Sequence, residues 1–549
     1  MAFRFSLLTL LTLFAFTACG GDSPKGPTDL GPEFADVIDD QLDPSDLAPD
    51  APDLVQPDSS DLSLDQTEDT PQEVADAGDL TDLTDLNDLN DLQDLVDWAE
   101  LPPQDLVDTD DLPDLPPGPA TIHADFPSGN ISVLARLDDQ GAAWSLAIRS
   151  DNDSTSFPAN WRTWWYFRID NARTDVDTQL NIGAHGWFYD YLPIYSYDQE
   201  NWVHFAPTEV RLNGTVLEIT KRFTAPTVWV ARFFPYTHAD LAKYLDSIDG
   251  HPALTRTQLG LSSQNRSIEM LTITSPAPPS LTKQRIWMHA RTHPGETGPS
   301  YLLEGLIDFL LSDDPDAITA RQHFIFNLVP MHNPDGVEVG NYRTTPGGSN
   351  LEVGWLRQAG DPWQLQSNAP HEVQLLRDTI AGFYQGANTI PVSVALNLHS
   401  SNAEPATGVF FFPHFGSTSL GYTAEQAQLW TDQINLINDV ARRYEGRVEP
   451  GTNNNGYGFV SNAYPESWWW ANFGAAVNAI TLETVYGQAG FEPRWVDRGH
   501  LRSLGVAVGM ALLDYHGIPT TRRFKAWADA TFPWQPGRPL PGTEDELKM

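Results

Sequence analysis

The segment RIWMHARTHPGETGPSYLLEGLIDFLL, residues 285–311, decides the fold of this chain. Its first part, Arg285 to His289, is short and rich in apolar residues, as a buried strand would be, and its last part has leucines at helical spacing. Between the two parts, His293 and Glu296 stand three positions apart, which would make them neighbours on one face of a helical turn. We therefore expect the pair at the carboxyl end of a strand, where open α/β sheets place their ligands.

An imidazole and a carboxylate at this spacing can offer one nitrogen and one oxygen to a divalent ion, although surface helices often contain such pairs by chance. A catalytic zinc site also needs a third protein ligand and an open position for water. Two later apolar strands end in suitable residues: PVSVALNLHSSN reaches His399, and AAVNAITLETVYG reaches Glu483. A histidine after an apolar strand is more often structural, but a carboxylate at the exit of a buried strand is rarer without a partner.

We predict from these residues that the metal is held by His293, Glu296 and His399. Glu483 would then take a proton from water, whose pKa a bound metal lowers to about 7.

The ordered motifs HPGE, PMHNPDG, GNYR and TLETVYG, with His399 between the last two, resemble the zinc metallocarboxypeptidases. The likeness is greatest to the branch called cytosolic carboxypeptidases, which carries a β-sandwich before its catalytic domain. The segments WWYFRIDN and FFPYTHADLAKYL look like that arrangement. The resemblance covers roughly residues 120 to 520 and implies an α/β fold with a carboxypeptidase-like mixed sheet flanked by helices. It also implies one zinc ion per chain and a peptide or protein substrate.

By position, the resemblance assigns functional roles to five residues. The zinc ligands fall on His293, Glu296 and His399. The general base falls on Glu483, and the oxyanion-stabilising arginine falls on Arg343.

A physical argument also favours a functional role for Arg343. Attack on a carbonyl builds negative charge on oxygen, and a fixed guanidinium stabilises that charge strongly where water is excluded. The alternative is a surface arginine in a loop rich in glycine and threonine. The preceding Asn333-Pro334-Asp335-Gly336 is expected to be a turn that aims this loop.

One departure from the family affects substrate binding. After the arginine loop the family normally reads Asp-Leu-Asn-Arg, and its Asn-Arg pair holds the substrate's terminal carboxylate. This chain has Asn350-Leu351-Glu352-Val353 there, so a carboxylate and an apolar side chain replace the pair. Either Arg357, one helical turn on, substitutes for the lost arginine, or Glu352 binds an amine.

Three functions therefore stay open. The chain is a carboxypeptidase, a zinc amidase or deacylase that is not anchored on a terminal carboxylate, or a surface binding protein that keeps the metal without turnover. The presence of both a base and an oxyanion-stabilising arginine favours an enzyme.

The family also places a mobile tyrosine over its substrate. Tyr457 and Tyr464, in the segment NNNGYGFVSNAYPESWWW, stand at a suitable distance before Glu483. We predict that one of the two covers the substrate; the alternative is that both are ordinary loop tyrosines.

Residues 1–18 are expected to be a signal peptide. One early arginine precedes an apolar stretch from Phe5 to Phe16, which is too short to span a bilayer. Cys19, the single cysteine, follows Phe16-Thr17-Ala18, and together they resemble a bacterial lipobox. The resemblance implies cleavage before Cys19, lipidation of its thiol and a membrane anchor in the bacterial cell envelope, at the outer membrane or cell surface. The alternative is an ordinary secretory signal with an incidental cysteine.

Residues 19–118 differ in composition from the rest and contain the near-repeat DLTDLTDLNDLNDLQDLVDW. About 30 of the 74 acidic residues lie here against one lysine. Such a sequence buries too little apolar surface to offset chain entropy, so we predict a disordered acidic linker. A calcium-binding acidic repeat is the alternative, although the glycines that let carboxylates fold round an ion are missing.

The rest of the chain is expected to be globular. Residues 119–250 alternate apolar and polar in short strands, with a hairpin signal at Asn213-Gly214, and indicate an all-β sandwich. Residues 251–520 alternate strands with helices such as 367–384, which indicates the catalytic domain, and residues 521–549 form a Pro-rich tail. Although the net charge is −42, no basic stripe is present, which argues against a nucleic-acid partner.

Overall fold

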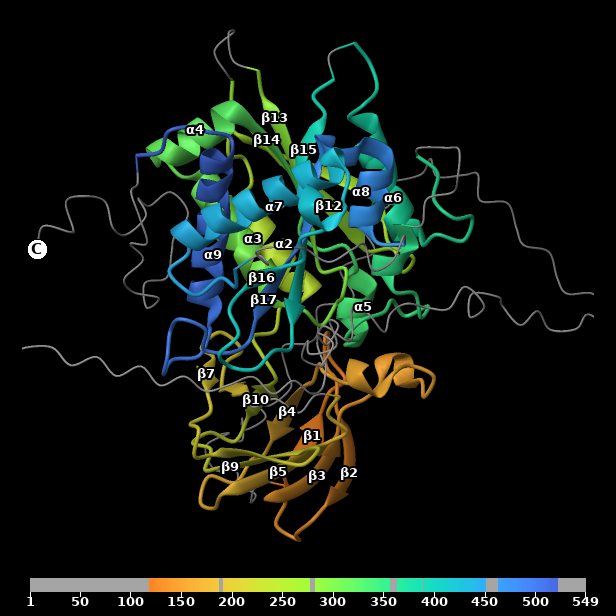
Figure 1. The fold of residues 1–549 in the computed structure, drawn as a ribbon. Helices are drawn as coiled ribbons and strands as arrows, with labels where there is room; N and C mark the ends of the chain where they lie inside the picture. The colour runs from red at the N-terminus through yellow and green to blue at the C-terminus, as the bar shows by residue number, and fades with distance from the viewer. Residues whose placement is uncertain are drawn as a thin grey trace, which may run out of the picture. The chain divides into compact units, whose positions relative to one another are not determined.

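The structure is a computed structural model that describes residues 118–186, 191–276, 282–355, 363–387, 389–450 and 463–521 (Figure 1). Cys19, Arg357 and Tyr457 lie outside these residues, as do the signal peptide, the acidic linker up to residue 117 and the tail beyond residue 521. Predictions about them stay predictions. In the described part of the chain, no helix combines the length and apolar character that crossing a bilayer requires.

The first part of the described chain is an all-β sandwich, which confirms the prediction. Its two sheets have five strands each, in the orders β1-β4-β10-β6-β7 and β2-β3-β5-β9-β8. Phe167 and Ile169 of the first sheet share a buried core with Leu180 and Ile219 of the second. The hairpin is also confirmed, because β8 and β9 pair across a tight turn in which Gly214 has a φ of 60°.

The strands of the sandwich have the following bounds: β1 Thr121–His123, β2 Ser132–Arg136, β3 Ala143–Ala147, β4 Tyr166–Asp170, β5 Thr178–Gly183, β6 Ile194–Ser196, β7 Val203–His204, β8 Val210–Asn213, β9 Val216–Lys221 and β10 Val228–Ala231.

The second part is built on a seven-stranded sheet in the order β11-β12-β14-β13-β15-β17-β16. It is mixed, as predicted: β14, β13, β15 and β17 run parallel in the centre, and the strands at both edges pair antiparallel. The strands are β11 Leu254–Leu261, β12 Ser267–Ile273, β13 Gln284–Ala290, β14 Phe324–Val329, β15 Val392–Ser401, β16 Phe410–Phe411 and β17 Asn478–Val485.

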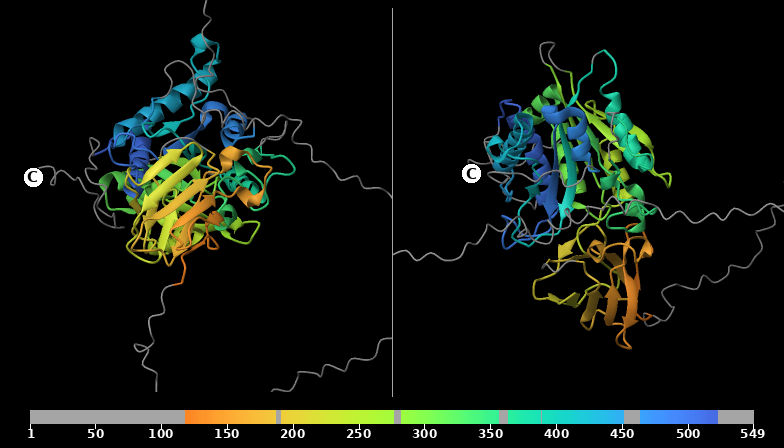
Figure 2. Two further views of the ribbon diagram at one scale, coloured as in Figure 1. Left: turned by 90° about the horizontal axis from the view of Figure 1, so that it is seen from below. Right: turned by 45° about the vertical axis from the view of Figure 1, so that its right-hand side comes forward.

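Helices cover both faces of this sheet (Figures 1 and 2). On β13, Ile286 and Met288 belong to a core with α3 and α9, whereas Trp287 faces the other way and packs with α6 and α8. Both faces of the central strands are buried, which explains their nearly continuous apolar sequences. The helices are α2 His238–Ser247, α3 Gly298–Leu311, α4 Pro315–His323, α5 Pro334–Val339, α6 His371–Gly382, α7 Ala424–Arg443, α8 Pro465–Phe473 and α9 Arg498–Tyr515.

Two local predictions differ from the structure. The segment Asn333–Gly336 was expected to be a turn, but Pro334 begins α5 because the Asn333 side chain caps it, accepting a hydrogen bond from the Gly336 N–H at 2.9 Å. The helix expected over residues 367–384 begins only at His371, and no side chain caps its first turn.

The three strands that carry the predicted metal and catalytic residues, β13, β15 and β17, are adjacent in the sheet. His399 on β15 and Glu483 on β17 are direct partners in the parallel register. The turn with His293 and Glu296 comes after the carboxyl end of β13. The sheet therefore brings residues that are far apart in sequence to one edge, as expected for an α/β fold.

Candidate metal centre

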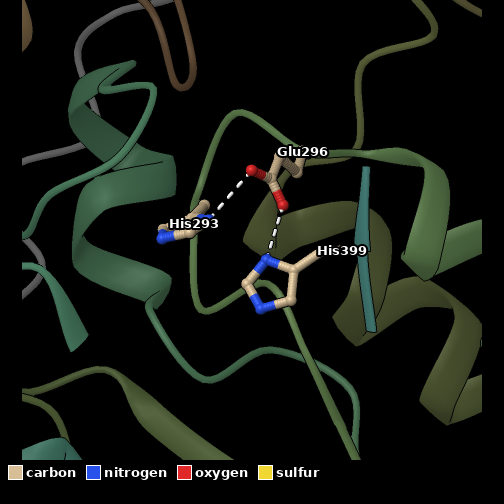
Figure 3. A group of neighbouring side chains, drawn as sticks. All are labelled: His293, Glu296 and His399. Atoms are coloured by element: carbon tan, nitrogen blue, oxygen red, sulfur yellow. Dashed lines mark hydrogen bonds and ion pairs between the residues drawn. The ribbon is translucent and has the colours of Figure 1, made fainter. Parts of the chain in front are cut away.

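His293, Glu296 and His399 come together in the structure, as predicted (Figure 3). The Nδ1 atoms of His293 and His399 lie 2.9 and 2.8 Å from the two carboxylate oxygens of Glu296. One donor atom from each residue lies within 4.8 Å of the others, and all three residues are buried. Two imidazole nitrogens and a carboxylate oxygen form the donor set of a three-ligand catalytic zinc site.

The turn from His293 to Glu296 depends on close packing around Gly295. It is closed by a hydrogen bond from the Glu296 N–H to the His293 carbonyl at 3.3 Å, just before α3, so the pair lies in a turn and not in a helix. A Cβ on Gly295 would come within 2.7 Å of the Tyr342 ring and 2.9 Å of the Trp164 Cβ. Only glycine fits there, which explains the HPGE sequence.

The buried guanidinium of Arg291 supports the same turn. Its Nε donates to the Pro294 carbonyl at 3.1 Å, and its Nη1 donates to the Tyr236 carbonyl and the Ser300 hydroxyl, both at 2.9 Å. Burial lowers the pKa of Arg291 to about 10, with the nearby tyrosines and Glu296 opposing it. Sequence reasoning missed this residue because a lone arginine after a strand carries no motif.

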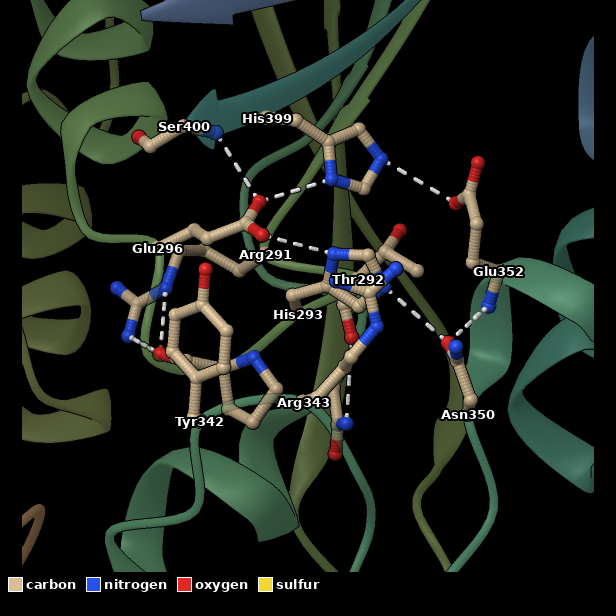
Figure 4. Close-up of polar contacts among 12 residues, drawn as sticks. Arg291, Thr292, His293, Glu296, Tyr342, Arg343, Asn350, Glu352, His399 and Ser400 are labelled. Atoms are coloured by element: carbon tan, nitrogen blue, oxygen red, sulfur yellow. Dashed lines mark hydrogen bonds and ion pairs between the residues drawn. The ribbon is translucent and has the colours of Figure 1, made fainter. Parts of the chain in front are cut away.

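Asn350 and Glu352 hold the outer nitrogens of the two imidazoles (Figure 4). The Nε2 of His293 lies 3.2 Å from Asn350 Oδ1, and the Nε2 of His399 lies 3.2 Å from Glu352 Oε2. Both oxygens are acceptors here, so the two Nε2 atoms donate to them, and the two Nδ1 atoms are the ones that would bind a metal beside Glu296. Metal-binding histidines are commonly oriented in this way. The arrangement therefore fits zinc.

The charges around His399 fit a dication as well. Burial lowers the pKa of His399, but the carboxylates of Glu352 and Glu296 outweigh burial and raise it well above its usual value. Burial acts to raise the pKa of Glu352, yet His399 and His293 hold it at about 2. Buried acids at this density need compensating positive charge, which a divalent ion supplies.

Glu483 has the environment of a general base. It is 8% exposed, and its Oε2 makes no hydrogen bond to the described residues. Burial raises its pKa to about 8; His399 and Arg343 lower it, and Glu296 and Glu352 raise it further. A carboxylate with a raised pKa and a free oxygen can accept a proton from water.

The guanidinium of Arg343 is buried and lies over the ring of Trp161, 5.4 Å from its centroid. Its charge lowers the pKa of both His293 and Glu483, which places it electrostatically close to the metal ligands and the base. Figure 4 shows Arg343 beside His293. A loop arginine exposed on the surface is therefore not what the structure shows.

The predicted substrate-binding residues are more scattered. Glu352 is buried, and its second oxygen accepts a hydrogen bond from Asn397 Nδ2 at 2.8 Å, while Val353 is half-buried beside it. Tyr464 is the residue just before α8, and its carbonyl accepts a hydrogen bond from the Trp468 N–H at 3.1 Å. Its role over the substrate, like that of Tyr457, stays a prediction.

A second buried acid next to Glu352 was not predicted. Glu466 accepts a hydrogen bond from the Thr481 hydroxyl at 2.7 Å. Burial raises the pKa of Glu466 to about 7, and Glu352 adds to that rise. The only sequence signal was an acid at the start of a tryptophan-rich helix, which is equally typical of a helix N-terminus.

Comparisons with known proteins agree with this geometry. Residues 122–233 match the family model described as the cytosolic carboxypeptidase N-terminal domain, and residues 241–397 match the model described as zinc carboxypeptidase. The domain built on the seven-stranded sheet is therefore similar to the zinc carboxypeptidase family. The matched residues include His293, Glu296 and Arg343, while His399 and Glu483 lie beyond the match and join the site through the fold.

Cytosolic carboxypeptidase 6 of Mus musculus is 32% identical over 265 residues, which are 45% of this chain and 48% of that protein. Cytosolic carboxypeptidase 2 of Xenopus tropicalis is 32% identical over 255 residues, which are 41% of this chain and 26% of that protein. The chain thus spans about half the length of the first relative and about a quarter of the second.

Among solved structures, a metallo-carboxypeptidase from Burkholderia cenocepacia superposes with a TM-score of 0.61 at 23% identity. The match covers 73% of this chain and 99% of that one. At this level of identity the likeness shows the fold alone.

We expect Glu352→Gln to weaken zinc binding roughly 10- to 100-fold, because the residue that orients a metal-binding histidine sets its basicity and its direction. Competition with a chromophoric chelator measures the affinity. Glu404→Gln, on an exposed carboxylate in the loop after β15, is the matched control and should bind zinc as the wild type does. Wild-type affinity in a folded Glu352→Gln protein would contradict this role.

Proposed function

We propose that this chain is a zinc-dependent peptidase that hydrolyses a peptide-like bond at a chain end. The observation that supports it most is the register of β15 and β17, in which His399 and Glu483 are neighbours and Glu483 Oε2 has no hydrogen-bond partner among the described residues. A protein that only binds a metal has no need of a buried free base at this position, where its burial costs stability.

In the proposed reaction, Glu483 accepts the proton of the attacking water and later donates it to the leaving amine. Zinc, when bound to His293, Glu296 and His399, supplies Lewis-acid chemistry that acidifies water and polarises the substrate carbonyl. The guanidinium of Arg343 stabilises the negative charge that develops on the carbonyl oxygen. Because these groups are buried, their interactions with the reacting atoms are stronger than in water.

Replacing Glu483 by Gln should keep zinc bound and abolish hydrolysis, because the amide has nearly the same shape but cannot accept the proton. We expect kcat to fall by at least about 10²-fold, the lower range for loss of general base catalysis. Zinc content and turnover of a blocked dipeptide are measured on the same preparation. Unchanged turnover would rule out the base, and turnover absent from the wild type too would favour the binding protein.

We make a separate proposal about which kind of chain end the site recognises. Glu352 is occupied by His399 and Asn397. By the sequence resemblance, Val353 takes the position of the family's carboxylate-binding arginine. Relative to Asn-Arg, the Glu-Val pair makes this part of the site more negative by two charges. We propose that a free terminal carboxylate is not held there, and that the enzyme accepts neutral or cationic chain ends.

Peptides that differ only in a free or amidated C-terminus test this proposal. We expect the amidated peptide to be cleaved with at least the kcat/KM of the free acid, because no pair of guanidinium donors compensates the carboxylate at this position. The double variant Glu352→Asn/Val353→Arg should shift the ratio toward the free acid. A strong wild-type preference for the free acid would show that another cation, such as Arg357, has replaced the lost arginine.

We also propose that the protein is a lipoprotein of the bacterial cell envelope, at the outer membrane or cell surface. The support is the order of the first residues: an apolar segment, the lipobox-like Phe16-Thr17-Ala18-Cys19, and a long acidic linker. Two hydrophobic signals or more are needed for stable anchoring, and a diacylated cysteine meets that need.

Cys19→Ser should move the protein from the membrane fraction to the soluble or secreted fraction, because the thiol that carries the lipid is lost. Fractionation with immunoblotting measures this, with metabolic labelling by a radioactive fatty acid as the second readout. Membrane association of the Cys19→Ser protein equal to that of the wild type would refute the anchor.

A further inference from the structure

A carboxylate of the β-sandwich holds the loop that carries Arg343. Asp151, in the short 3-10 helix η2 (Asp151–Asp153), is 1% exposed. Its Oδ1 accepts from the Tyr342 N–H at 2.6 Å, and its Oδ2 accepts from the N–H groups of Arg343 and Thr344 at 2.8 and 2.7 Å. The Thr344 hydroxyl donates to Oδ2 as well, at 3.0 Å.

Three consecutive backbone donors on one carboxylate fix the orientation of the peptide planes on both sides of the Arg343 Cα. Burial raises the pKa of Asp151, while the backbone N–H groups of the loop lower it. Charge-assisted hydrogen bonds of this kind are about twice as strong as neutral ones. The loop therefore has one strongly preferred backbone conformation at the residue that matters for the reaction.

Asn152, the residue after Asp151, also holds this loop, through amide hydrogen bonds. The Asn152 N–H donates to Asn341 Oδ1 at 3.0 Å, and the Asn341 amide donates back to Asn152 Oδ1 at 2.8 Å. The Asn152 amide also donates to the Thr345 carbonyl at 3.0 Å. Asn152 has a φ of 53°, a left-handed conformation that asparagine tolerates better than most residues. The two sandwich residues thus hold the loop from Asn341 to Thr345.

The side chain of Arg343 meets the sandwich too. Trp161, in a second 3-10 helix of that domain, η3 (Ala159–Trp161), lies under the guanidinium at 5.4 Å. A cation over an indole face is attracted to it and loses freedom of movement. The N-terminal domain therefore contacts both the backbone and the guanidinium of Arg343.

We propose that Asp151 is a positioning residue for the reaction: through it, the β-sandwich sets the direction in which Arg343 presents its guanidinium to the developing oxyanion. This inference rests on the proposed function, in which Arg343 stabilises that charge. It assigns the sandwich a part in catalysis, although none of its residues is among the metal ligands or the base.

Asp151→Asn tests the inference, because it keeps the size of the side chain, removes its charge and turns one acceptor into a donor that faces N–H groups. We expect kcat to fall by on the order of 10²-fold, the effect of a misplacement of about 1 Å, with KM and zinc content close to those of the wild type. Asp153→Asn is the matched control: it lies in the same 3-10 helix, but its side chain is 68% exposed and pairs with Arg149. It should leave kcat unchanged.

A double-mutant cycle separates positioning from general stability. Arg343→Ala alone should lower kcat by on the order of 10²- to 10³-fold, as for removal of an oxyanion-stabilising group. Adding Asp151→Asn to it should then cost little more, because the group that Asp151 positions is already gone. Equal losses from Asp151→Asn in both backgrounds would overturn the inference while leaving the proposed function intact. Full activity of Arg343→Ala would instead overturn the role of Arg343.

Asn152→Gly provides the same test with a milder change. Glycine tolerates the φ of 53° and removes only the side-chain hydrogen bonds of Asn152, which include those with the Asn341 amide and the Thr345 carbonyl, so the protein should fold even where Asp151→Asn does not. We expect a smaller loss of kcat that again disappears in the Arg343→Ala background. A loss that persists in that background would contradict the inference for the sandwich contact as a whole.

Discussion

The carboxylate of Glu296 is the group on which the rest of the site depends. It meets the Nδ1 atoms of both histidines and also accepts the Ser400 N–H at 3.0 Å. Because Glu296 belongs to the turn before α3 and His399 to β15, this one side chain fixes the distance between the helix entry and the neighbouring strand. The small volume of Gly295 and the hydrogen bonds of Arg291 are consequences of that requirement, since a bulkier or freer turn would move the carboxylate away from the two imidazoles.

The exchange of Asn-Arg for Glu352-Val353 has two effects that cannot be separated. By the resemblance it removes a cation from the region that binds the substrate carboxylate, and in the structure Glu352 is a charged partner of the ligand His399. A carboxylate partner makes an imidazole a stronger donor to a metal. Under the proposed function, Glu352 therefore acts both on the basicity of the metal ligand and on the preference among chain ends. Glu466, whose pKa burial raises to about 7, extends the acidic character of this side of the site.

The metal ligands and the base were predictable because each stands at the carboxyl end of an apolar strand, and strand period and strand ends are local properties of the sequence. The parallel order of the strands then brings them together. Asn333 was interpreted wrongly because the same residue types favour a turn and a helix cap, and the conformation of the next few residues decides between the two. The contact of Glu352 with His399 spans 47 positions and that of Asp151 with Arg343 spans 192, so neither leaves a periodic signal in the sequence.

The N-terminal domain and its connection to the sheet contact the chain near Arg343, His399, Glu483 and the metal-binding turn. The Tyr236 carbonyl accepts from Arg291 beside the metal-binding turn, and Asp151 holds the loop of Arg343. Arg232, at the end of β10, donates to the Asn402 side chain just after His399 and stacks on Tyr486 just after Glu483, 4.8 Å from its ring.

The hydrogen bonds among these contacts are buried, so loss of one partner would leave the other polar group unsatisfied. The sheet places the strands side by side, whereas the sandwich holds the segments that follow the strand ends. The sandwich therefore supports the segments at the strand ends that carry the candidate site.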